Sequence, residues 1–316
     1  MTHEIQIVKR SGERVRFDLQ KWQAQIAKVC EGVADVSPSM IEIAAQAHFR
    51  DGMTTRELDE IALKSMINLI DEEEHPDVGN VNYQYVAGKQ RVGMLRKEVY
   101  GQHEPPRLYE IVQRNVSLLL YTPDLLEWYS EAEWDQFDRY IEHEKDETLA
   151  YAAVDQLIEK YLIRNRATNH IVETPQVRYM IAAATMFHAE TRDRTKLVKD
   201  FYHASSDGLF TLATPVLAGL GTKTKQFSSC VLLRSDDTLK SIFATGQVMA
   251  DYAAKRAGIG LEIGRLRPLG ASIRQGEVMH TGIIPFLKKW FADLRSCCLT
   301  PDMYVEIIDT DDELPK

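Results

Sequence analysis

The sequence predicts a mixed protein that is α+β at its start and α/β at its end, with a mostly helical part between them. A turn between two short strand signals opens the chain, apolar residues at helical spacing dominate the middle, and from Leu212 short apolar strands alternate with helices. Such alternation is typical of parallel β-α construction. With 316 residues, the chain is long enough for two or three packed domains.

The first part begins with a predicted β-hairpin. Residues 5–8 form a strand, residues 9–12 (Lys-Arg-Ser-Gly) a turn and residues 15–17 the returning strand. A helix follows from Leu19, because apolar residues then recur on one helical face. That face contains Trp22, Ile26, Val29 and Cys30. Cys30 is therefore predicted to be a core residue, as free cysteines commonly are.

A second helix is predicted to begin near Thr54, whose hydroxyl would cap it while Glu57 reaches back in a capping box. Its buried face would contain Leu58, Ile61, Ala62 and Leu69. The acidic run 71–77 is interpreted as a solvated loop. A third helix is predicted over residues 85–96.

Between Pro105 and about residue 210 the sequence predicts mostly helix. Residues 147–157 are strong helix formers. A further buried face would contain Val177, Ile181, Ala184 and Phe187 or His188. We interpret His188 as a packed or surface residue rather than a ligand.

The last part is predicted to contain a strand over 227–233, a helix over 239–256 and a second strand over 258–263. This order predicts two parallel strands joined by a helix.

Composition excludes several classes of protein. A net charge of −9 argues against a broad nucleic-acid surface, although a local pocket for a nucleotide is compatible with it. The four cysteines, at positions 30, 230, 297 and 298, have neither zinc-site spacing nor the pattern of a disulfide framework, so no metal site is predicted. No apolar run approaches the roughly 18 residues that span a bilayer, and residues 1–4 are polar, unlike a signal peptide. We expect a cytoplasmic chain with no membrane partner and no direct nucleic-acid partner.

One cysteine lies in an unusual setting. Cys230 follows two serines in the apolar, strand-like run 226–232 (Gln-Phe-Ser-Ser-Cys-Val-Leu). On spacing alone, such a thiol is either a core residue or a redox group. The run, with Thr214-Pro215 upstream, is similar to the active-site strand of the large (alpha) subunit of class I ribonucleotide reductase.

That resemblance implies roles for several residues. Cys230 would be one member of the thiol pair that reduces the substrate and becomes a disulfide. Thr214 and Ser229 would hold the substrate's diphosphate and ribose, and Gly258 would let the backbone approach the nucleotide closely. In the family, a cysteine thiyl radical first removes the ribose 3′-hydrogen. That radical cysteine and the second thiol of the pair would lie beyond this chain.

The first part resembles the ATP-cone, a regulatory nucleotide-binding domain of many ribonucleotide reductases. The resemblance rests on Val8-Lys9-Arg10-x-Gly12, on Asp51-Gly52-x-x-Thr55 and on Arg96-Lys97 before Tyr100-Gly101. A triphosphate needs cationic side chains and free backbone donors from a glycine-containing turn.

The cone resemblance implies that Lys9 and Lys97 meet phosphates and that Thr55 donates its hydroxyl. The residues that would flank the nucleotide are Val15, Arg16, Phe17, Asp18, Leu19, Gln20 and Lys21. Asp59 and Met94 stand where enzymes inhibited by dATP often carry histidines. Inhibition by dATP is therefore not expected to accompany binding.

A second effector site is implied by Asp237-Thr238-Leu239 with Arg267 and Arg274. These residues resemble the family's specificity site, where a deoxynucleoside triphosphate or ATP selects which base is reduced. Asp237 would accept a hydrogen bond from a ribose hydroxyl. Arg267 and Arg274 would pair with phosphates through planar forks that lysine cannot reproduce.

The resemblance divides the chain into four stretches. Residues 1–100 would be the ATP-cone, 101–211 a helical domain and 212–297 the opening strands of a ten-stranded α/β barrel, which would expose unpaired edges. Residues 298–316 fall outside the family and begin like an intein, although with Met303 where inteins usually have threonine. The alternative for this acidic tail is an unrelated terminal segment.

The implied function is that of the N-terminal part of the large subunit, which reduces ribonucleoside diphosphates. Its expected partners are a C-terminal large-subunit fragment carrying the radical cysteine, a small subunit that generates the radical at a di-metal centre, and thioredoxin or glutaredoxin as reductant. ATP and dNTPs would be effectors, with no cofactor bound covalently in this chain. The rival functions are a nucleotide-binding regulatory fragment and an inactive pseudoenzyme.

Overall fold

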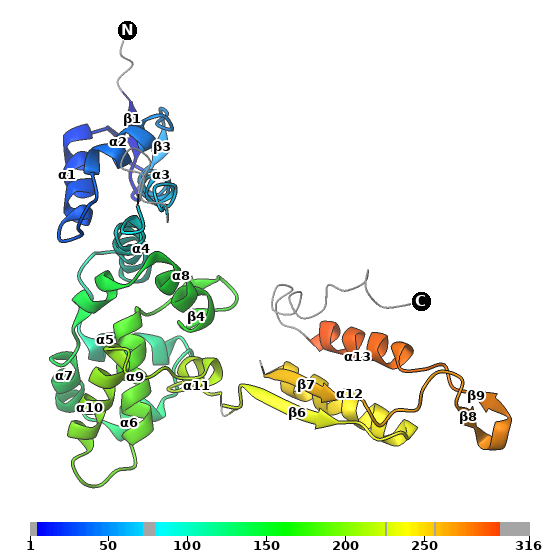
Figure 1. Cartoon of the computed structure of the whole chain (residues 1–316). Helices are drawn as coiled ribbons and strands as arrows, with labels where there is room; N and C mark the ends of the chain where they lie inside the picture. The colour runs from blue at the N-terminus through cyan, green and yellow to red at the C-terminus, as the bar shows by residue number, and fades with distance from the viewer. Residues whose placement is uncertain (1–4, 72–79, 225, 256, 298–316) are drawn as a thin grey trace. The chain divides into compact units, whose positions relative to one another are not determined.

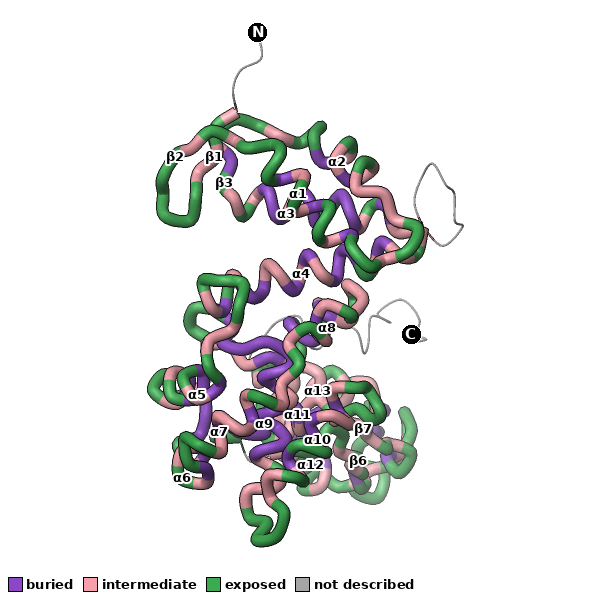
Figure 2. The backbone as a smooth tube through the Cα atoms, turned by 90° about the vertical axis from the view of Figure 1, so that its left-hand side faces the viewer, coloured by how far each residue is buried: buried purple, intermediate pink, exposed green. Residues whose placement is uncertain are grey.

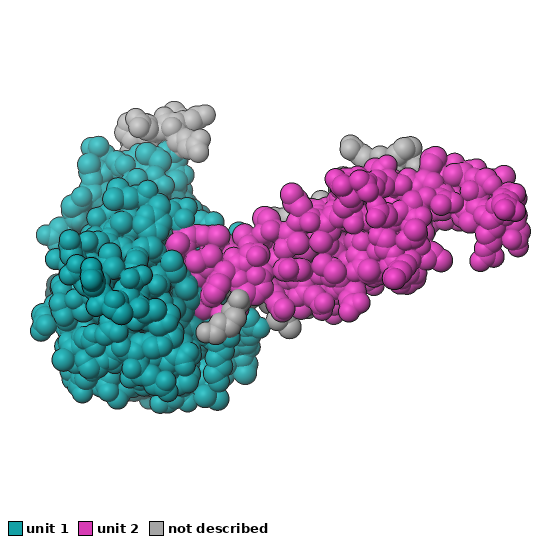
Figure 3. Space-filling model, turned by 90° about the horizontal axis from the view of Figure 1, so that it is seen from below, with its two compact units in different colours: residues 1–211, 220–223 teal, residues 212–219, 224–316 magenta. Residues whose placement is uncertain are grey.

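The chain forms two compact units (Figures 1 and 3). The computed structural model describes residues 5–71, 80–224, 226–255 and 257–297. The first unit contains the chain up to residue 211 together with 220–223, and the second contains 212–219 and the residues from 224 onward. Most of the predicted acidic loop and the whole intein-like tail lie outside the described residues.

The first unit opens with a small sheet in the order β2-β1-β3. Strands β1 (Gln6–Val8) and β2 (Arg14–Arg16) pair antiparallel, which confirms the predicted hairpin. Strand β3 (Met53–Thr54) adds to β1 in parallel, with Val8 opposite Thr54. The turn of the hairpin contains Gly12, whose φ of +83° favours glycine.

Within the described residues of the cone there are four helices: α1 (Leu19–Cys30), α2 (Pro38–Gln46), α3 (Thr55–Ile67) and α4 (Tyr83–Tyr100). Trp22, Ile26 and Cys30 are buried, as predicted, and the Thr54–Glu57 capping box is present. Ile61 is only partly buried, contrary to the prediction. Helix α2 was not predicted, because it is short and its buried residues are only Ile41 and Ala45.

Most of the helical part of the first unit packs around an aromatic-rich core. Figure 2 shows the burial along its backbone. Its helices are α5 (Leu108–Ser117), α6 (Asp124–Trp128), α7 (Glu131–Asp138), α8 (Tyr151–Lys160), α9 (Pro175–Phe187) and α10 (Arg194–Ser206), with the 3₁₀ helix η1 (His143–Thr148) and the hairpin β4 (Arg164–Asn165) and β5 (His170–Ile171). Helix α8 and strand β5 pack against α4 in a second cluster. The predicted buried face of α9 is confirmed at Val177, Ile181 and Ala184. His188 stacks on Trp128 with ring centroids 3.8 Å apart, so it is a packed residue.

The helix predicted over 147–157 begins only at Tyr151. Leu149 and Ala150 are extended because this segment crosses α4 at Gly88, where an added Cβ would lie 2.0 Å from the Leu149 carbonyl oxygen. Tertiary contact therefore overrides the local helix propensity of these residues.

The second unit contains the predicted strand-helix-strand motif. Strands β6 (Cys230–Arg234) and β7 (Gly258–Glu262) pair in parallel and are joined by α12 (Leu239–Ala253). Strand β6 begins three residues later than predicted, because the Ser228 backbone N–H bonds to the Gln226 side chain (2.7 Å) instead of entering a ladder. Helix α12 ends before Arg256, where the Ala257 N–H turns back to the Tyr252 carbonyl (3.1 Å).

The remaining elements of this unit are α11 (Thr214–Gly219), the hairpin β8 (Ser272–Ile273) and β9 (Val278–Met279) with η2 (Arg274–Gly276) between them, and α13 (Ile284–Cys297). Helix α13 packs on α12 through Trp290, whose indole N–H donates to the Ile242 carbonyl (3.1 Å). The core here consists of Ile242, Met249, Leu266 and Trp290.

Strand β6 exposes apolar side chains. Cys230 is exposed, and Leu232 on the same face is 86% exposed. The interpretation of Cys230 as a core residue is therefore wrong for this structure, because no described segment of the second unit covers this face. Among the helices of the described ranges, none is long and apolar enough to cross a membrane.

Candidate functional site

The predicted phosphate-binding residues of the cone converge at one end of its sheet. Lys9 lies in the hairpin turn, and the pairing of Val8 with Thr54 places Lys9 and Thr55 at adjacent strand ends. The neighbouring Arg10 guanidinium donates to the Lys97 carbonyl (2.7 Å), which brings the hairpin tip to the last turn of α4. Three segments far apart in sequence therefore meet here.

The predicted flanking residues run away from the hairpin tip, because β2 is antiparallel to β1: Arg16 pairs with Gln6, and the Phe17 N–H donates to the Ile5 carbonyl (2.9 Å). Val15 and Arg16 lie on β2, and Phe17 packs edge-to-face on Phe49 with centroids 5.2 Å apart. Asp18 caps α1 by accepting from the Lys21 backbone N–H (3.0 Å). Leu19, Gln20 and Lys21 are exposed in the first turn of α1. Phe17 and the first turn of α1 therefore lie toward the start of β1, at the other end of the strand from Lys9.

Both lysines of the cone are paired with carboxylates. The Lys9 Nζ lies 2.8 Å from Glu13 Oε2 in an exposed ion pair. The Lys97 Nζ lies 3.1 Å and 3.3 Å from the two carboxylate oxygens of Asp59, a buried residue of α3. The sequence identified Asp59 only as a departure from the family pattern. Its pairing with Lys97, 38 positions away, depends on the packing of α3 against α4.

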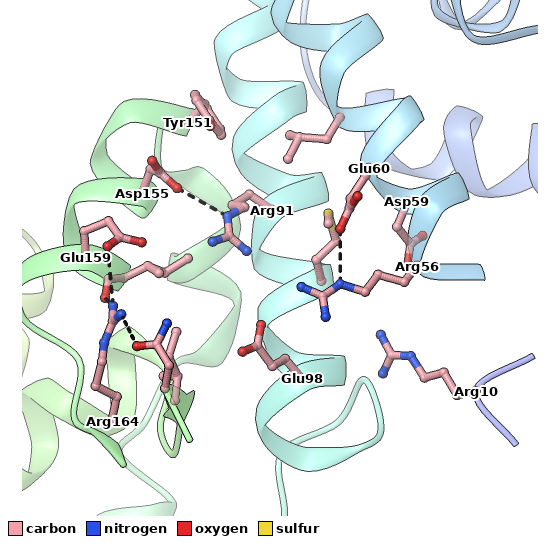
Figure 4. Close-up of a pocket in the computed structure, with 15 residues that line it drawn as sticks. Arg10, Arg56, Asp59, Glu60, Arg91, Glu98, Tyr151, Asp155, Glu159 and Arg164 are labelled. Carbon is pink, nitrogen blue, oxygen red and sulfur yellow. Dashed lines mark hydrogen bonds and ion pairs between the residues drawn. The ribbon is translucent and has the colours of Figure 1, made fainter. Parts of the chain in front are cut away.

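A pocket of about 590 Å³ adjoins this region, between the cone and the helical part of the first unit (Figure 4). It is lined by Arg10, Arg56, Asp59, Glu60, Leu63, Arg91, Met94, Glu98, Tyr151, Asp155, Ile158, Glu159, Arg164, Asn169 and Ile171. Arg91 pairs with Asp155 (3.4 Å), and Arg56 pairs with Glu60 (3.1 Å). Carboxylates outnumber guanidiniums here, so the pocket is not a general anion site. Sequence reasoning missed its helical wall, because α4 and α8 meet only in the folded chain.

Two of the predicted substrate residues, Ser229 and Gly258, adjoin Cys230 at the start of the β6–β7 ladder, whereas Thr214 lies in α11. Gly258 pairs with Cys230 across the ladder, and its N–H donates to the Ser229 carbonyl (2.8 Å). A Cβ at Gly258 would lie 3.7 Å from the Cys230 Sγ. Thr214 begins α11, and a Cβ at Gly219, the last residue of α11, would lie 3.0 Å from the Phe227 ring. Helix α11 and the segment leading to β6 are therefore close together.

Of the three cysteines within the described residues, Cys297 is partly exposed, and Cys30 and Cys230 differ most in their environment. Cys30 is buried in the cone core, and burial raises the pKa of its thiol to about 11. A thiol of that pKa is almost entirely protonated at neutral pH, so Cys30 is chemically inert. Cys230 is exposed and sits at the start of a parallel strand. Only Cys230 of these two is accessible for redox chemistry.

The predicted specificity residues are partly brought together. Asp237 accepts from the Arg267 side chain and from its backbone N–H (3.4 Å). Although burial acts to raise it, these interactions hold the pKa of Asp237 below its usual value. Thr238 caps α12 by accepting from the Ser241 N–H (3.1 Å), and Leu239 is exposed in the first turn.

Arg274 lies at the exposed tip of the β8–β9 hairpin. Its φ of +49° and the φ of +60° at Gln275 form a tight left-handed turn. The Arg267 guanidinium also donates to the Ser272 carbonyl (3.3 Å), which ties Arg267 to the base of this hairpin. Asp237 and Arg267 thus form one pair, and Arg274 is joined to it through β8.

Comparisons with known domain families match the chain in three successive stretches. The ATP cone domain matches residues 5–98, the ribonucleotide reductase all-alpha domain residues 147–225, and the ribonucleotide reductase barrel domain residues 228–297. Their order agrees with the cone, the helical part and the β6-α12-β7 motif seen here. The chain therefore belongs to the ribonucleotide reductase large-subunit family and carries its ATP-cone, its helical domain and the start of its barrel.

Curated relatives agree with this assignment. The chain is 41% identical over 298 residues to ribonucleoside-diphosphate reductase 1 subunit alpha of Escherichia coli (strain K12), which covers 94% of this chain and 38% of the relative. It is 40% identical over 298 residues to the subunit alpha of Haemophilus influenzae, with 94% and 39% covered. It is 40% identical over 293 residues to the subunit alpha of Enterobacteria phage T4, with 93% and 38% covered. The chain thus spans about two fifths of the length of these relatives and corresponds to their N-terminal part.

Proposed function

We propose that this chain supplies the N-terminal part of a class I ribonucleoside-diphosphate reductase large subunit. The observation that carries the proposal is the cluster on β6 and β7, where Cys230, Ser229 and Gly258 adjoin within the stretch that matches the barrel domain. A protein that only senses nucleotides has no need for the Cys230 thiol and the Ser229 hydroxyl next to Gly258, which has no side chain to cover the strand surface.

The proposed chemistry is a two-electron reduction of the ribose. Cys230 and a second thiol, supplied by a C-terminal large-subunit partner, give two electrons and two protons. The C2′ hydroxyl leaves as water, a C2′–H bond forms, and the thiols close to a disulfide. The same partner would supply the radical cysteine, and a small subunit would generate the radical at its di-metal centre. Thioredoxin or glutaredoxin would then reduce the disulfide.

The exposure of β6 supports the need for such a partner. Radical chemistry requires a site closed to water, yet Cys230 and Leu232 are exposed on the same face. Parallel strands that carry active sites are buried on both faces in complete sheets. We infer that the remaining barrel strands, carried by the partner, cover this face.

The proposal is tested by CDP reduction with the chain, the C-terminal fragment and the small subunit expressed together. Cys230→Ser should abolish turnover supported by a dithiol, because one of the two reducing thiols is lost. Cys297→Ser, at the end of α13, is the matched control and should keep activity. Turnover by Cys230→Ser at the wild-type rate would remove Cys230 from the mechanism. A stable complex without turnover would instead favour the regulatory function.

We further propose two effector sites, one at the cone and one at Asp237 and Arg267. Arg267→Ala should weaken binding of a deoxynucleoside triphosphate to the second site about tenfold, because a charge-assisted contact to phosphate is lost. Calorimetric titration with the intact chain measures this. Arg265→Ala is the control, since Arg265 pairs with the exposed Asp236 (2.8 Å) outside the proposed contact set. Unchanged affinity in Arg267→Ala would exclude Arg267 from the site.

A further inference from the structure

Lys97 is not free to receive an anion in this structure. Its ammonium contacts both carboxylate oxygens of Asp59, and the two side chains are 31% and 11% exposed. An ion pair this sheltered is screened by solvent less than a surface pair. A triphosphate that reaches Lys97 must therefore replace Asp59 as its partner.

Asp59 is held where it is by other contacts. The Gln25 side-chain amide donates to Asp59 Oδ1 (3.4 Å), and the Gln90 amide donates to the Asp59 carbonyl (3.3 Å). The carboxylate therefore cannot move far from the lysine without losing a second partner. A phosphate bound at Lys97 would lie close to this negative charge and would be repelled by it.

We propose that Asp59 is an internal competitor for the effector nucleotide of the cone. Its carboxylate is the partner of the Lys97 ammonium, so nucleotide binding would exchange one anion for another and would be weaker than Lys97 alone would give. This inference rests on the proposed effector role of the cone. It assigns Asp59 the task of setting the effector concentration at which the cone responds.

The opposite role would be that Asp59 positions Lys97 for the phosphates. The two roles predict opposite changes in nucleotide affinity when the charge of Asp59 is removed. If Asp59 competes, removing its charge tightens nucleotide binding; if it positions the lysine, removing its charge weakens binding. Asp59→Asn keeps the shape of the side chain and removes only the charge, so it separates the two.

The test is calorimetric titration of the intact chain with MgATP, in an Arg267→Ala background that disables the second proposed effector site. Asp59→Asn should bind ATP about tenfold more tightly than its parent. Glu60→Gln is the matched control, because it removes the same charge from the next position of α3 without touching Lys97, and it should change affinity less than twofold. Asp59→Ser provides a second variant if Asp59→Asn unfolds.

A double-mutant cycle completes the test. Lys97→Met should lose most ATP binding, and in that background Asp59→Asn should give no gain, because the lysine it releases is absent. Equal or weaker binding by Asp59→Asn would overturn the inference in favour of positioning. An equal gain in Glu60→Gln would overturn it in favour of a general charge effect.

Failure of the proposed function gives a different result. If the parent chain and every variant, including Lys97→Met, bind ATP alike or not at all, the cone is not the effector site and both proposals fall. If Lys97→Met loses binding while Asp59→Asn gains none, the effector role stands and only the inference about Asp59 is removed.

Discussion

The cone and strand β6, which carries Cys230, differ in how far their charged side chains are paired and their apolar side chains are buried. In the cone, Lys9 and Lys97 are paired with carboxylates of the same unit, and the helices share a buried apolar core, although Ile43 of α2 is 72% exposed. On β6, Cys230 and Leu232 are exposed, and the first turns of α12 expose Leu239 and Phe243. The cone thus has paired lysines and a buried core, whereas the start of the barrel part gathers an exposed thiol and several exposed apolar side chains.

This difference indicates which region of the proposed enzyme would depend on a partner chain. A region whose charges and apolar groups are satisfied internally can fold and bind an effector by itself. A region with an exposed thiol and exposed apolar residues gains stability and function only when another surface covers it. The following predictions test each side of this comparison.

The most severe effect is expected at the centre of the first unit. Arg178 pairs with Glu173 at 3.3 Å, both side chains are 0% exposed, and Arg178 also donates to the Leu220 carbonyl (2.6 Å). Arg178→Met leaves the Glu173 carboxylate buried without its cation, which should cost about 3–5 kcal/mol of unfolding free energy. Urea denaturation followed by circular dichroism measures the change.

The control for that experiment is an exposed pair of the same unit. Arg56→Met removes the cation from Glu60, but Arg56 is largely in solvent, so the cost should stay within about 0.5 kcal/mol. Equal destabilisation by the two substitutions would contradict the picture of a first unit that depends on its internal pairs.

The second prediction concerns the thiols. Cys230 should be alkylated by iodoacetamide at pH 8 at least about a hundredfold faster than Cys30, because Cys30 is buried and its raised pKa leaves little thiolate. Adding the C-terminal large-subunit fragment should slow alkylation of Cys230 and leave Cys30 unchanged. Peptide mass spectrometry over time reports both sites. A Cys230 rate unaffected by the fragment would argue against coverage of β6 by that partner.

Local signals in the sequence predicted much of this fold. The Thr54–Glu57 capping box and the β6-α12-β7 motif depend on residues within a few turns of one another, and the structure contains both. Helix α2 was missed because only two of its residues are buried. The start of α8 was misplaced because the close approach of Leu149 to Gly88 is a contact between distant segments.

The sites show the same division. Sequence motifs identified Lys97 and Cys230, but they gave neither the partner of Lys97 nor the exposure of Cys230. The first depends on the packing of α3 against α4, and the second on which surfaces are present to cover β6. An apolar run predicts that a strand will be buried, but it does not identify the segment or chain that covers the strand.

The third prediction concerns the junction where the cone's last helix enters the helical part. Asp146 of η1 is fully buried, and burial raises its pKa to about 7 against the lowering effect of the neighbouring Arg96. Arg96 itself is held by Glu147 (2.8 Å) and by the His143 carbonyl (2.5 Å). Between about pH 4 and pH 7 the folded chain keeps a proton on Asp146 that the unfolded chain releases, so this group lowers stability as pH rises through that window.

Asp146→Asn removes the titrating group and keeps its shape. At pH 8 the variant should be more stable than the parent chain by on the order of 2 kcal/mol, and the difference should vanish towards pH 4. His143 has the opposite pH dependence. Burial, with a smaller effect of Arg96, lowers its pKa to about 4. Below about pH 6.5 the unfolded chain therefore binds a proton that the folded chain does not, and stability falls as the pH falls. This contribution is common to both proteins and cancels in their difference. Thermal unfolding at several pH values measures that difference, and a value that does not change with pH would show that folding does not raise the pKa of Asp146.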